Sequence, residues 1–508
     1  MASREVLQPA NLQATVVADA TKPGLNWWRI ADAAVLFVYS SVVLFTLQYH
    51  EKWADEAQAW LLARDLDLKT LWFKELRYEG SPGLWHTILW IAQHVFHARY
   101  GALGYIGAAG AIAGTALLIF KAPFPRYIRW PLAFTYVMVY QYAVIARPYT
   151  LLPLLCFSVA IFFKDLEHPE RITIVLILLA TLTFHGTVLA GCFGLLYLIE
   201  AMRGWSKLDC SSPGRYVICA AALIATFIVL FIILKPTPDN EEFVTRAQLA
   251  QLPAAAKLQI HVPTAPRKIE SIVSGAFLDY LAPSAMFLLL TAFWFILRRR
   301  TLVFVLPVAS MIALYSVIHG YAHHQGTAFV AAITAFWIAW PNRSESHSRR
   351  YPWVKPGVIA LLLCLCLVNI WDAAVAIKRE YLYPYSGAQD AANYLKSIGA
   401  QEKTIFGVVY GVAAVQTYFD KNIFANMQTT YFHHGLPLAG TRLDMEELDR
   451  VQPEFVVAYS TEPNLMMMDG VQELGLHGYA IAHFSDGYYL YKQGVYERET
   501  YFIFRRVH

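Results

Sequence analysis

The residues best suited to chemistry lie just after the first apolar segment of the chain. The stretch His50–Trp60, which reads HEKWADEAQAW, places Asp55 and Glu56 side by side. A carboxylate at a membrane surface can act as a general base that takes a proton from an attacking hydroxyl group. Acidic side chains are equally favoured in the first turn of an ordinary solvated helix, because they face the positive end of the helix dipole. The pair alone leaves both interpretations open.

Three later segments carry polar side chains at the edges of apolar runs. Arg147, in the sequence ARPY, could bind a phosphate in a bidentate manner or only snorkel to the interface. His185 could contact a phosphate or be one more hydrogen-bonded histidine of a helix bundle. His323 and His324 follow His319 in the sequence HGYAHHQG, where phosphate contact, interface packing and metal binding are all open. No acid stands beside these histidines, so their spacing favours metal binding least.

The composition indicates that these residues belong to a protein embedded in a membrane. Of the 508 residues, 57% are hydrophobic and 15% are charged, whereas soluble domains have roughly 25% charged residues. The excess of apolar side chains must therefore face lipid. The 14 Trp, 30 Tyr and 30 Phe suit long membrane–water interfaces. The net charge of +4 gives no reason to expect a nucleic-acid partner.

Apolar runs that approach the roughly 20 residues needed to cross a bilayer recur from residue 31 to residue 373. They predict a polytopic α-helical protein with about eleven transmembrane helices, at 31–48, 102–120, 130–146, 148–163, 172–185, 186–202, 214–234, 283–297, 301–319, 326–340 and 354–373. The segment 83–97 is interrupted by polar side chains. We expect it to lie at the membrane interface, and a twelfth crossing is the alternative.

The Lys and Arg residues of the short loops predict the orientation. Positive clusters near residues 121–129, 164–171, 203–215, 298–300 and 343–350 fall on one side of the membrane if the spans are correct. We assign that side to the cytoplasm, together with residues 1–30. The transmembrane domain then covers 31–373, and its outer loop 49–101 carries Asp55 and Glu56.

The tail at 374–508 is more charged than the rest of the chain, and this orientation places it outside the cytoplasm. Strand-like runs alternate with helical patterns, which is typical of a small α/β domain. The strand-like runs are 404–410, 455–459 and 488–492, and the helical patterns include 388–395 and 444–450. We expect His433 and His434 to lie on the surface of this domain.

Taken together, three motifs resemble those of the GT-C superfamily of membrane glycosyltransferases. They are the Asp55–Glu56 pair, the YEGSPGLW stretch that begins at Tyr78, and the ARPY sequence at 146–149. Their order and spacing are similar to those of the protein O-mannosyltransferase-like family (glycosyltransferase family 39-like). The second motif departs from that family's pattern because its second proline is missing. The resemblance covers about residues 30–200 closely and the later spans loosely.

This resemblance implies an inverting glycosyltransferase in a bacterial inner membrane, with its active site on the outer face. The donor would be a hexose or pentose on a polyprenyl phosphate, the acceptor a hydroxyl group of a glycan, lipid or protein, and membrane lipid a further partner. Asp55 would be the catalytic carboxylate, accompanied by Glu56. The substrate-binding residues implied are Glu79, Arg147, Tyr149, His185, His323 and His324.

A metal requirement does not follow from the resemblance. Many relatives carry a second acid just before the Ala-Arg-x-Tyr motif, where this chain has Ala143, Val144 and Ile145. The missing acid argues against an obligatory divalent metal. A divalent metal is still possible, but the sequence predicts no metal ligands.

Two other functions use similar membrane architecture. A transporter or flippase of lipid-linked glycans would require ionisable residues near the middle of the bilayer and an inverted repeat. This chain has few central charges and no repeat. A polymerase or ligase of lipid-linked glycans would share the donor, and the sequence leaves that alternative open.

The orientation can be tested by cysteine labelling in intact cells. A cysteine that replaces Ser206, in a basic loop, should react only after the membrane is permeabilised. A cysteine that replaces Thr430, in the tail, should react with an impermeant reagent from outside. Protection of position 430 would mean that the tail is cytoplasmic and that the catalytic face has been assigned to the wrong side of the membrane.

Overall fold

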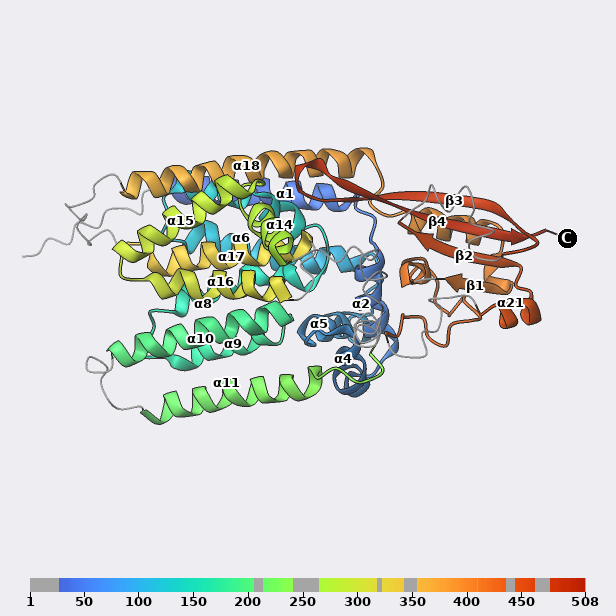
Figure 1. Cartoon of the computed structure of the whole chain (residues 1–508), viewed down its shortest axis with the longest axis horizontal. Coiled ribbons are helices and arrows are strands. Elements are labelled where there is room, and N and C mark those ends of the chain that lie inside the picture. The colour runs from blue at the N-terminus through green and yellow to red at the C-terminus, as the bar shows by residue number, and fades with distance from the viewer. Residues whose placement is uncertain are drawn as a thin grey trace, which may run out of the picture.

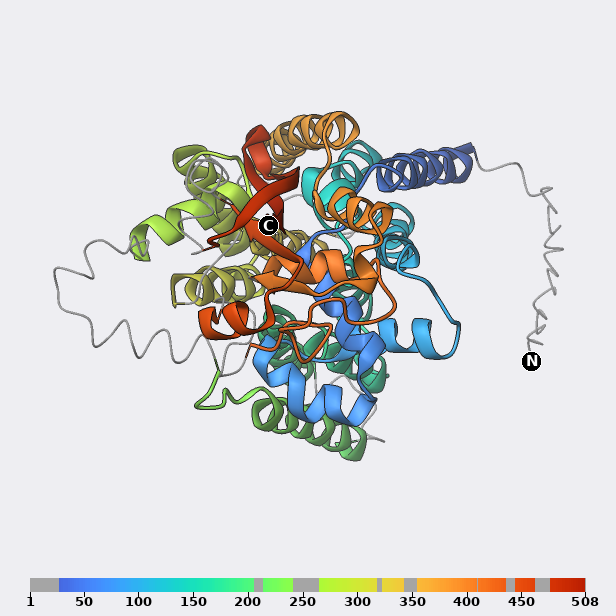
Figure 2. The same cartoon turned by 90° about the vertical axis from the view of Figure 1, so that its right-hand side faces the viewer.

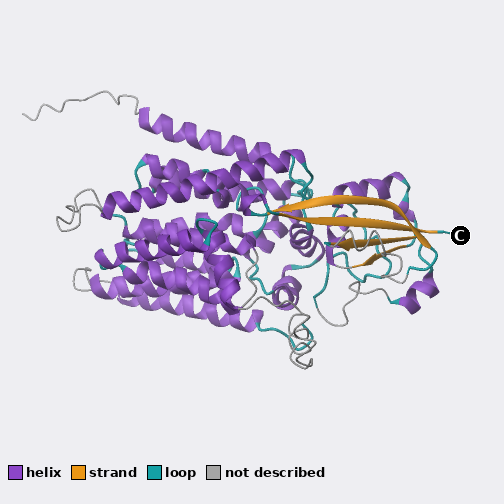
Figure 3. Ribbon diagram, turned by 45° about the horizontal axis from the view of Figure 1, so that its top comes forward, coloured by secondary structure: helices purple, strands orange, loops and turns teal. Residues whose placement is uncertain are grey.

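The computed structural model describes residues 27–204, 213–240, 265–317, 322–341, 354–408, 410–434, 444–461 and 476–507. Apolar helices form a bundle, and a four-stranded sheet with short helices lies beyond one end of it (Figures 1 and 3). The expected fold class, a polytopic α-helical membrane protein with a small C-terminal α/β domain, is confirmed.

Five described helices are long and apolar enough to cross a membrane. They are α1 (Trp27–Leu47), α6 (Ala102–Lys121), α10 (Phe184–Gly204), α11 (Pro213–Leu234) and α18 (Val354–Leu382). The pair α14 (Ala265–Ala276) and α15 (Leu281–Leu297), bent by 73°, gives a sixth if it counts as one span. Shorter helices complete the bundle: α8 (Leu152–Phe162), α9 (Pro169–Ala180), α16 (Thr301–Val317) and α17 (Ala322–Ala339).

One expected span, 130–146, is not a continuous helix. The structure shows α7 (Arg126–Ala133), the π-helix η2 (Val137–Gln141) and irregular turns before the 3-10 helix η3 (Pro148–Leu151). Non-helical backbone survives at membrane depth only where protein surrounds it. That condition holds, since residues from Thr135 to Ala146 are all buried. The prediction failed because an apolar run does not reveal whether it faces lipid or protein.

The first loop forms a layer of short helices between the bundle and the sheet (Figure 1). These are α2 (Ala54–Asp65), α3 (Leu68–Thr70), η1 (Leu71–Glu75), α4 (Leu76–Glu79) and α5 (Leu84–His94). At a rise of about 1.5 Å per residue, α5 is about 16 Å long and too short for a hydrocarbon core of about 30 Å. The segment 83–97 is therefore a short helix, as expected, and its 11 residues do not form a full span.

The sheet has the order β1-β2-β4-β3, with β1 and β2 parallel and the other pairs antiparallel. Its strands are β1 (Ile405–Val408), β2 (Phe455–Ser460), β3 (Tyr479–Leu490) and β4 (Tyr496–Arg506). One face packs on α19 (Ala388–Ser397) and α20 (Ala413–Gln416), and the other on α21 (Met445–Val451). Alternate side chains of β2 and β4 supply these two cores, as the two-residue period of a strand requires.

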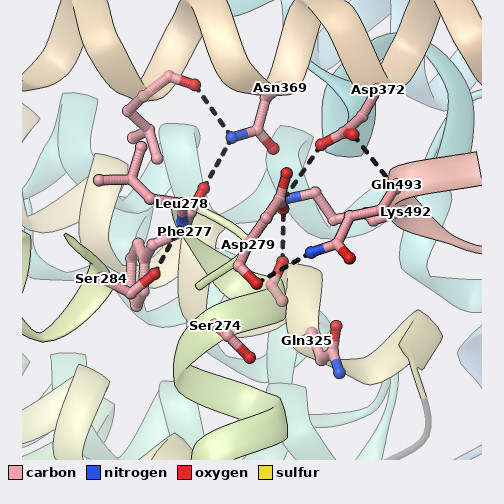
Figure 4. Close-up of polar contacts among 12 residues, drawn as sticks. Ser274, Phe277, Leu278, Asp279, Ser284, Gln325, Asn369, Asp372, Lys492 and Gln493 are labelled. Carbon is pink, nitrogen blue, oxygen red and sulfur yellow. Dashed lines mark hydrogen bonds and ion pairs between the residues drawn. The ribbon is translucent and has the colours of Figure 1, made fainter. Parts of the chain in front are cut away.

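The β3–β4 hairpin fastens this domain to the bundle. Its tip, η7 (Lys492–Gly494), places the Lys492 ammonium 2.7 Å from Asp279 Oδ1 and 3.6 Å from Asp372 Oδ2 (Figure 4). The Gln493 backbone N–H donates to Asp372 Oδ1 at 3.1 Å. The Lys492 side chain is only 9% exposed. Loss of one partner would leave a buried uncompensated charge, so this contact strongly favours the docked arrangement.

A buried carboxyl group inside the sheet domain makes stability depend on pH. Glu499 on β4 is fully buried, accepts from the Gly387 N–H at 3.2 Å and accepts from the Tyr489 hydroxyl. Burial raises its pKa to about 8. The folded domain therefore holds this proton up to a higher pH than the unfolded chain, so stability falls as pH rises from about 4.5, the usual Glu value, to about 8.

The variant Glu499→Gln should flatten that dependence. The amide keeps the shape, its oxygen can accept from the Gly387 N–H and its NH2 group can donate to the Tyr489 hydroxyl, and it has no proton to lose. Thermal unfolding of the detergent-solubilised protein between pH 5 and pH 8 measures the effect. The wild type should lose more stability toward pH 8 than the variant, and parallel curves would contradict the assignment.

Candidate active site

Asp55 lies where the first loop, the Arg147 turn and the tail meet. It stands in the first turn of α2, after the N-cap residue Trp53. Its Oδ2 is 3.0 Å from Arg147 Nη1, and its Oδ1 accepts a hydrogen bond from the Tyr410 hydroxyl at 2.8 Å. Burial and the nearby Asp55 raise the pKa of Tyr410, which stays a donor at neutral pH. The Asp55 side chain is 25% exposed and can be reached by a ligand.

Glu56 points the opposite way, into the protein. Its side chain is fully buried, and Oε1 accepts from the Ala146 N–H at 2.7 Å, immediately before Arg147. Its Oε2 contacts His50 Nε2 at 3.0 Å, and His50 Nδ1 contacts Glu380 Oε1 at 2.8 Å. Burial alone would lower the pKa of His50, but Glu56 and Glu380 outweigh it and raise it to about 10. An imidazolium thus joins two carboxylates.

Arg147 is held between aromatic rings. Its guanidinium lies 5.6 Å from the ring centres of both Trp53 and Tyr149, and its side chain is 18% exposed. Nη1 is buried, and within the described part of the chain it has the ion pair with Asp55 but no hydrogen bond. Arg147 directly precedes η3, which begins with Pro148. The hydrogen bond from the Ala146 N–H to Glu56 holds the backbone in place just before Arg147.

The predicted histidines lie on the far side of Tyr149. The Tyr149 hydroxyl is 3.1 Å from His185 Nδ1, and the His185 and His324 rings are 4.7 Å apart. His323 and His324 are neighbours with ring centres 4.1 Å apart, and Tyr149 is 6.2 Å from the His323 ring. His185 comes from α10 and the pair from α17. His319, their predicted companion, lies outside the described residues.

These histidines are not arranged as metal ligands. The described residues contain no group of three or more His, Cys, Asp or Glu side chains that could hold a metal ion. The ring contacts instead form a wall of imidazoles and phenols beside Arg147. These rings place N–H and O–H groups beside the positive charge of Arg147.

Glu79 stands on the tail-facing side of the site. Its Oε1 accepts from Gln58 Nε2 at 2.8 Å and lies 4.0 Å from His434 Nε2. Burial raises the pKa of Glu79 above its usual value. Gln58 also exchanges two hydrogen bonds with the backbone of Phe432, at 2.6 and 2.9 Å. One glutamine therefore holds both Glu79 and the tail segment.

His433 and His434, which were expected on the surface of the tail domain, are partly exposed and lie at its contact with the first loop. His433 Nδ1 contacts Glu75 Oε2 at 2.8 Å, and the two histidine side chains are 34% and 27% exposed. They pack where the tail meets the first loop. The sequence carried no signal for these contacts or for Tyr410, because each joins residues more than 350 positions apart.

Comparison with known proteins gives one informative result. No family model matches the chain, and no curated protein matches it. The structure is similar to the crystal structure of ArnT from Cupriavidus metallidurans bound to undecaprenyl phosphate, with a TM-score of 0.51. The aligned regions cover 94% of this chain and 98% of that one, at 12% sequence identity.

At this identity the likeness concerns the fold, and it covers both the helix bundle and the C-terminal domain. The chain shares the fold of that ArnT structure, in agreement with the fold that the resemblance to the GT-C superfamily implied. The narrower resemblance to the protein O-mannosyltransferase-like family stays a prediction.

Glu56→Gln tests the buried network behind the site. The change leaves His50 between one carboxylate and an amide, and removing one partner of a buried ion pair commonly destabilises a protein by about 3–5 kcal/mol. Asp65→Asn on the same helix is the matched control, since exposed pairs such as Arg64–Asp65 contribute about 0–1 kcal/mol. Thermal unfolding in detergent should show a large loss for the first variant only. Equal unfolding temperatures for the two variants would contradict the structural role assigned to Glu56.

Proposed function

We propose that this protein is an inverting glycosyltransferase that moves a sugar from a polyprenyl phosphate to a hydroxyl acceptor at the membrane surface. The observation that carries the proposal is the Asp55–Arg147 pair, in which a partly exposed carboxylate lies 3.0 Å from a guanidinium with aromatic and imidazole rings packed beside it. The GT-C fold supports it, since the similar ArnT structure contains undecaprenyl phosphate, which is itself a polyprenyl phosphate.

Asp55 acts as the general base. It accepts the proton of the acceptor hydroxyl while that oxygen forms a bond to the anomeric carbon of the donor sugar. The bond from that carbon to the phosphate oxygen breaks, and the electron pair leaves with the lipid phosphate. Attack from the face opposite the leaving group inverts the configuration. A single positioned carboxylate is sufficient for this proton transfer.

Arg147 binds the phosphate of the donor. Without ligand its charge is compensated by Asp55, and a phosphate would replace this contact with bidentate hydrogen bonds. Asp55 would then be released from its ion pair and become a better base when the donor is in place. Two buried nitrogen atoms that lack a hydrogen-bond partner among the described residues, Arg147 Nη1 and His185 Nε2, suit such a ligand.

The remaining predicted residues divide between support and binding. Four ring side chains lie farther along the phosphate, where fixed hydrogen-bond donors stabilise the negative charge of the leaving group. They are Tyr149, His185, His323 and His324. Glu56 positions the Arg147 turn and touches no substrate. Glu79, with Tyr410 and His434 beside it, faces the tail and is placed to contact the acceptor or the sugar.

The surroundings of the site are proposed from the sequence. The bacterial inner membrane is the proposed location, with the site and the tail on its outer face. The acceptor is a glycan, a lipid or a protein, and the transferred sugar is a hexose or a pentose. No step of this mechanism runs through a metal ion.

The variant Asp55→Asn tests the mechanism. It keeps the size of the side chain but removes the base, so transfer from a panel of radiolabelled polyprenyl-phosphate sugars should fall by about 10²–10⁴-fold. Binding of undecaprenyl phosphate, measured by native mass spectrometry, should remain. Arg147→Ala should instead lose binding of undecaprenyl phosphate.

Asp65→Asn is again the matched control, because it changes an exposed carboxylate of the same helix. It should leave both transfer and binding unchanged. Wild-type turnover by the Asp55→Asn protein would overturn the assignment of the base, and unchanged binding by Arg147→Ala would overturn the phosphate site.

A further inference from the structure

A recess lies away from the proposed active site, between α18 and the β3–β4 hairpin. It is a groove of about 630 Å³. Figure 1 shows these elements side by side near the end of α18 that faces the sheet. The residues that matter are Trp371, Lys378, Arg379 and Tyr383 on the helix side, and Tyr488 and Tyr496 on the hairpin side. The groove therefore combines two cations with four large aromatic side chains.

The walls of this groove are fixed without a ligand. The tip of the hairpin is pinned to the bundle by Lys492, whose ammonium lies between Asp279 and Asp372 (Figure 4). Asp372 is the neighbour of Trp371 on α18, so the hairpin is held next to the start of the groove. A preformed recess binds a ligand without first ordering its walls.

Among the residues that the structure describes, the two cations of the groove have no acidic partner. Lys378 is exposed, and the Arg379 guanidinium lies over the Tyr496 ring at 4.9 Å. In the part of the chain that the structure describes, no carboxylate lies within ion-pair distance of either side chain.

The nearby acids are used elsewhere. Glu380 contacts His50 and Tyr140, Asp372 contacts the hairpin tip, and Asp486 pairs with Arg498. The groove therefore keeps its positive charge, and an anion is the complementary occupant.

The level of the groove in the membrane indicates what that anion is attached to. The helix α18 has 29 residues, while a hydrocarbon core takes about 20. The apolar part of α18 ends just before Lys378, and Trp371 and Tyr383 are 72% and 52% exposed beside the two cations. Exposed Trp and Tyr rings flanked by Lys and Arg are typical of the membrane–water interface. An anion at this level belongs to a lipid headgroup.

We propose that this groove binds the headgroup of an anionic phospholipid. Lys378 and Arg379 contact the phosphate, the tyrosine rings surround the polar part of the headgroup, and the acyl chains lie along the exposed face of α18 near Trp371 and Leu367. The lipid touches both α18 and the hairpin, and so strengthens the docking of the tail domain on the bundle.

This site is separate from the proposed donor site. Successive residues of a strand face opposite sides. Tyr488 lines the groove, whereas Tyr489 turns to the other side and packs on Trp53 beside Arg147, with ring centres 4.8 Å apart. The lipid in the groove is thus a bound membrane component, and the proposal does not depend on the transfer reaction.

Native mass spectrometry of the whole detergent-solubilised protein with added phosphatidylglycerol or phosphatidylcholine tests the proposal. The wild type should retain phosphatidylglycerol in preference to phosphatidylcholine. The double variant Lys378→Gln/Arg379→Gln should lose that preference, with binding about tenfold weaker or more, because both charge-assisted contacts are removed.

The matched control is Lys235→Gln, which removes an exposed lysine just beyond the end of another span, α11. It should keep the wild-type preference. Thermal unfolding checks that both variants fold, and added phosphatidylglycerol should stabilise the wild type more than the double variant. Equal retention of the two lipids by the wild type would overturn the proposal. An equal loss in the Lys235→Gln control would do so as well, since it would show only general attraction to cations.

Discussion

The buried carboxylate of Glu56 is the contact on which the arrangement of the site depends. It accepts from the Ala146 N–H, caps the start of α2 through the Trp53 N–H, and shares His50 with Glu380 of α18. This network therefore joins three separate parts of the chain, which are residues 50–56, the turn at Ala146 and α18. In a charged network without access to water each group must keep its partner, since an unpaired charged group would carry the full desolvation penalty. This requirement places Arg147 and Asp55 at 3.0 Å from each other.

The tail completes the site and is also fastened at a second point. On one side Tyr410, Phe432 and the two tail histidines contact the first-loop helices. On the other side Lys492 enters the bundle between two aspartates. Figure 2 looks onto the tail domain, which covers the ends of the helices at this face. Two separated attachments restrict rotation of the domain, so Tyr410 stays over Asp55.

The predictions made from the sequence agree best with the structure where they concern single continuous segments. The apolar runs at 31–48, 102–120 and 214–234 correspond to α1, α6 and α11, because hydropathy reports burial in lipid directly. The helix–strand alternation of the tail also corresponds to real elements. The run at 130–146 was expected to be one continuous helix but forms α7, η2 and irregular turns, since the same composition serves a chain segment buried in protein.

The candidate site shows the same division. Sequence motifs selected Asp55, Arg147, Tyr149, His185 and His324, which the fold brings into one connected group. The neighbours Asp55 and Glu56 looked alike in the sequence, but a helix turns successive side chains apart by about 100°, so Asp55 is partly exposed beside Arg147 and Glu56 is buried in the core. By itself the sequence determined a membrane protein with a small C-terminal domain, and it proposed candidate residues for the chemistry. Only the tertiary structure decided which carboxylate is accessible and that Tyr410 and Gln58 join the site, because these outcomes depend on contacts between segments hundreds of residues apart.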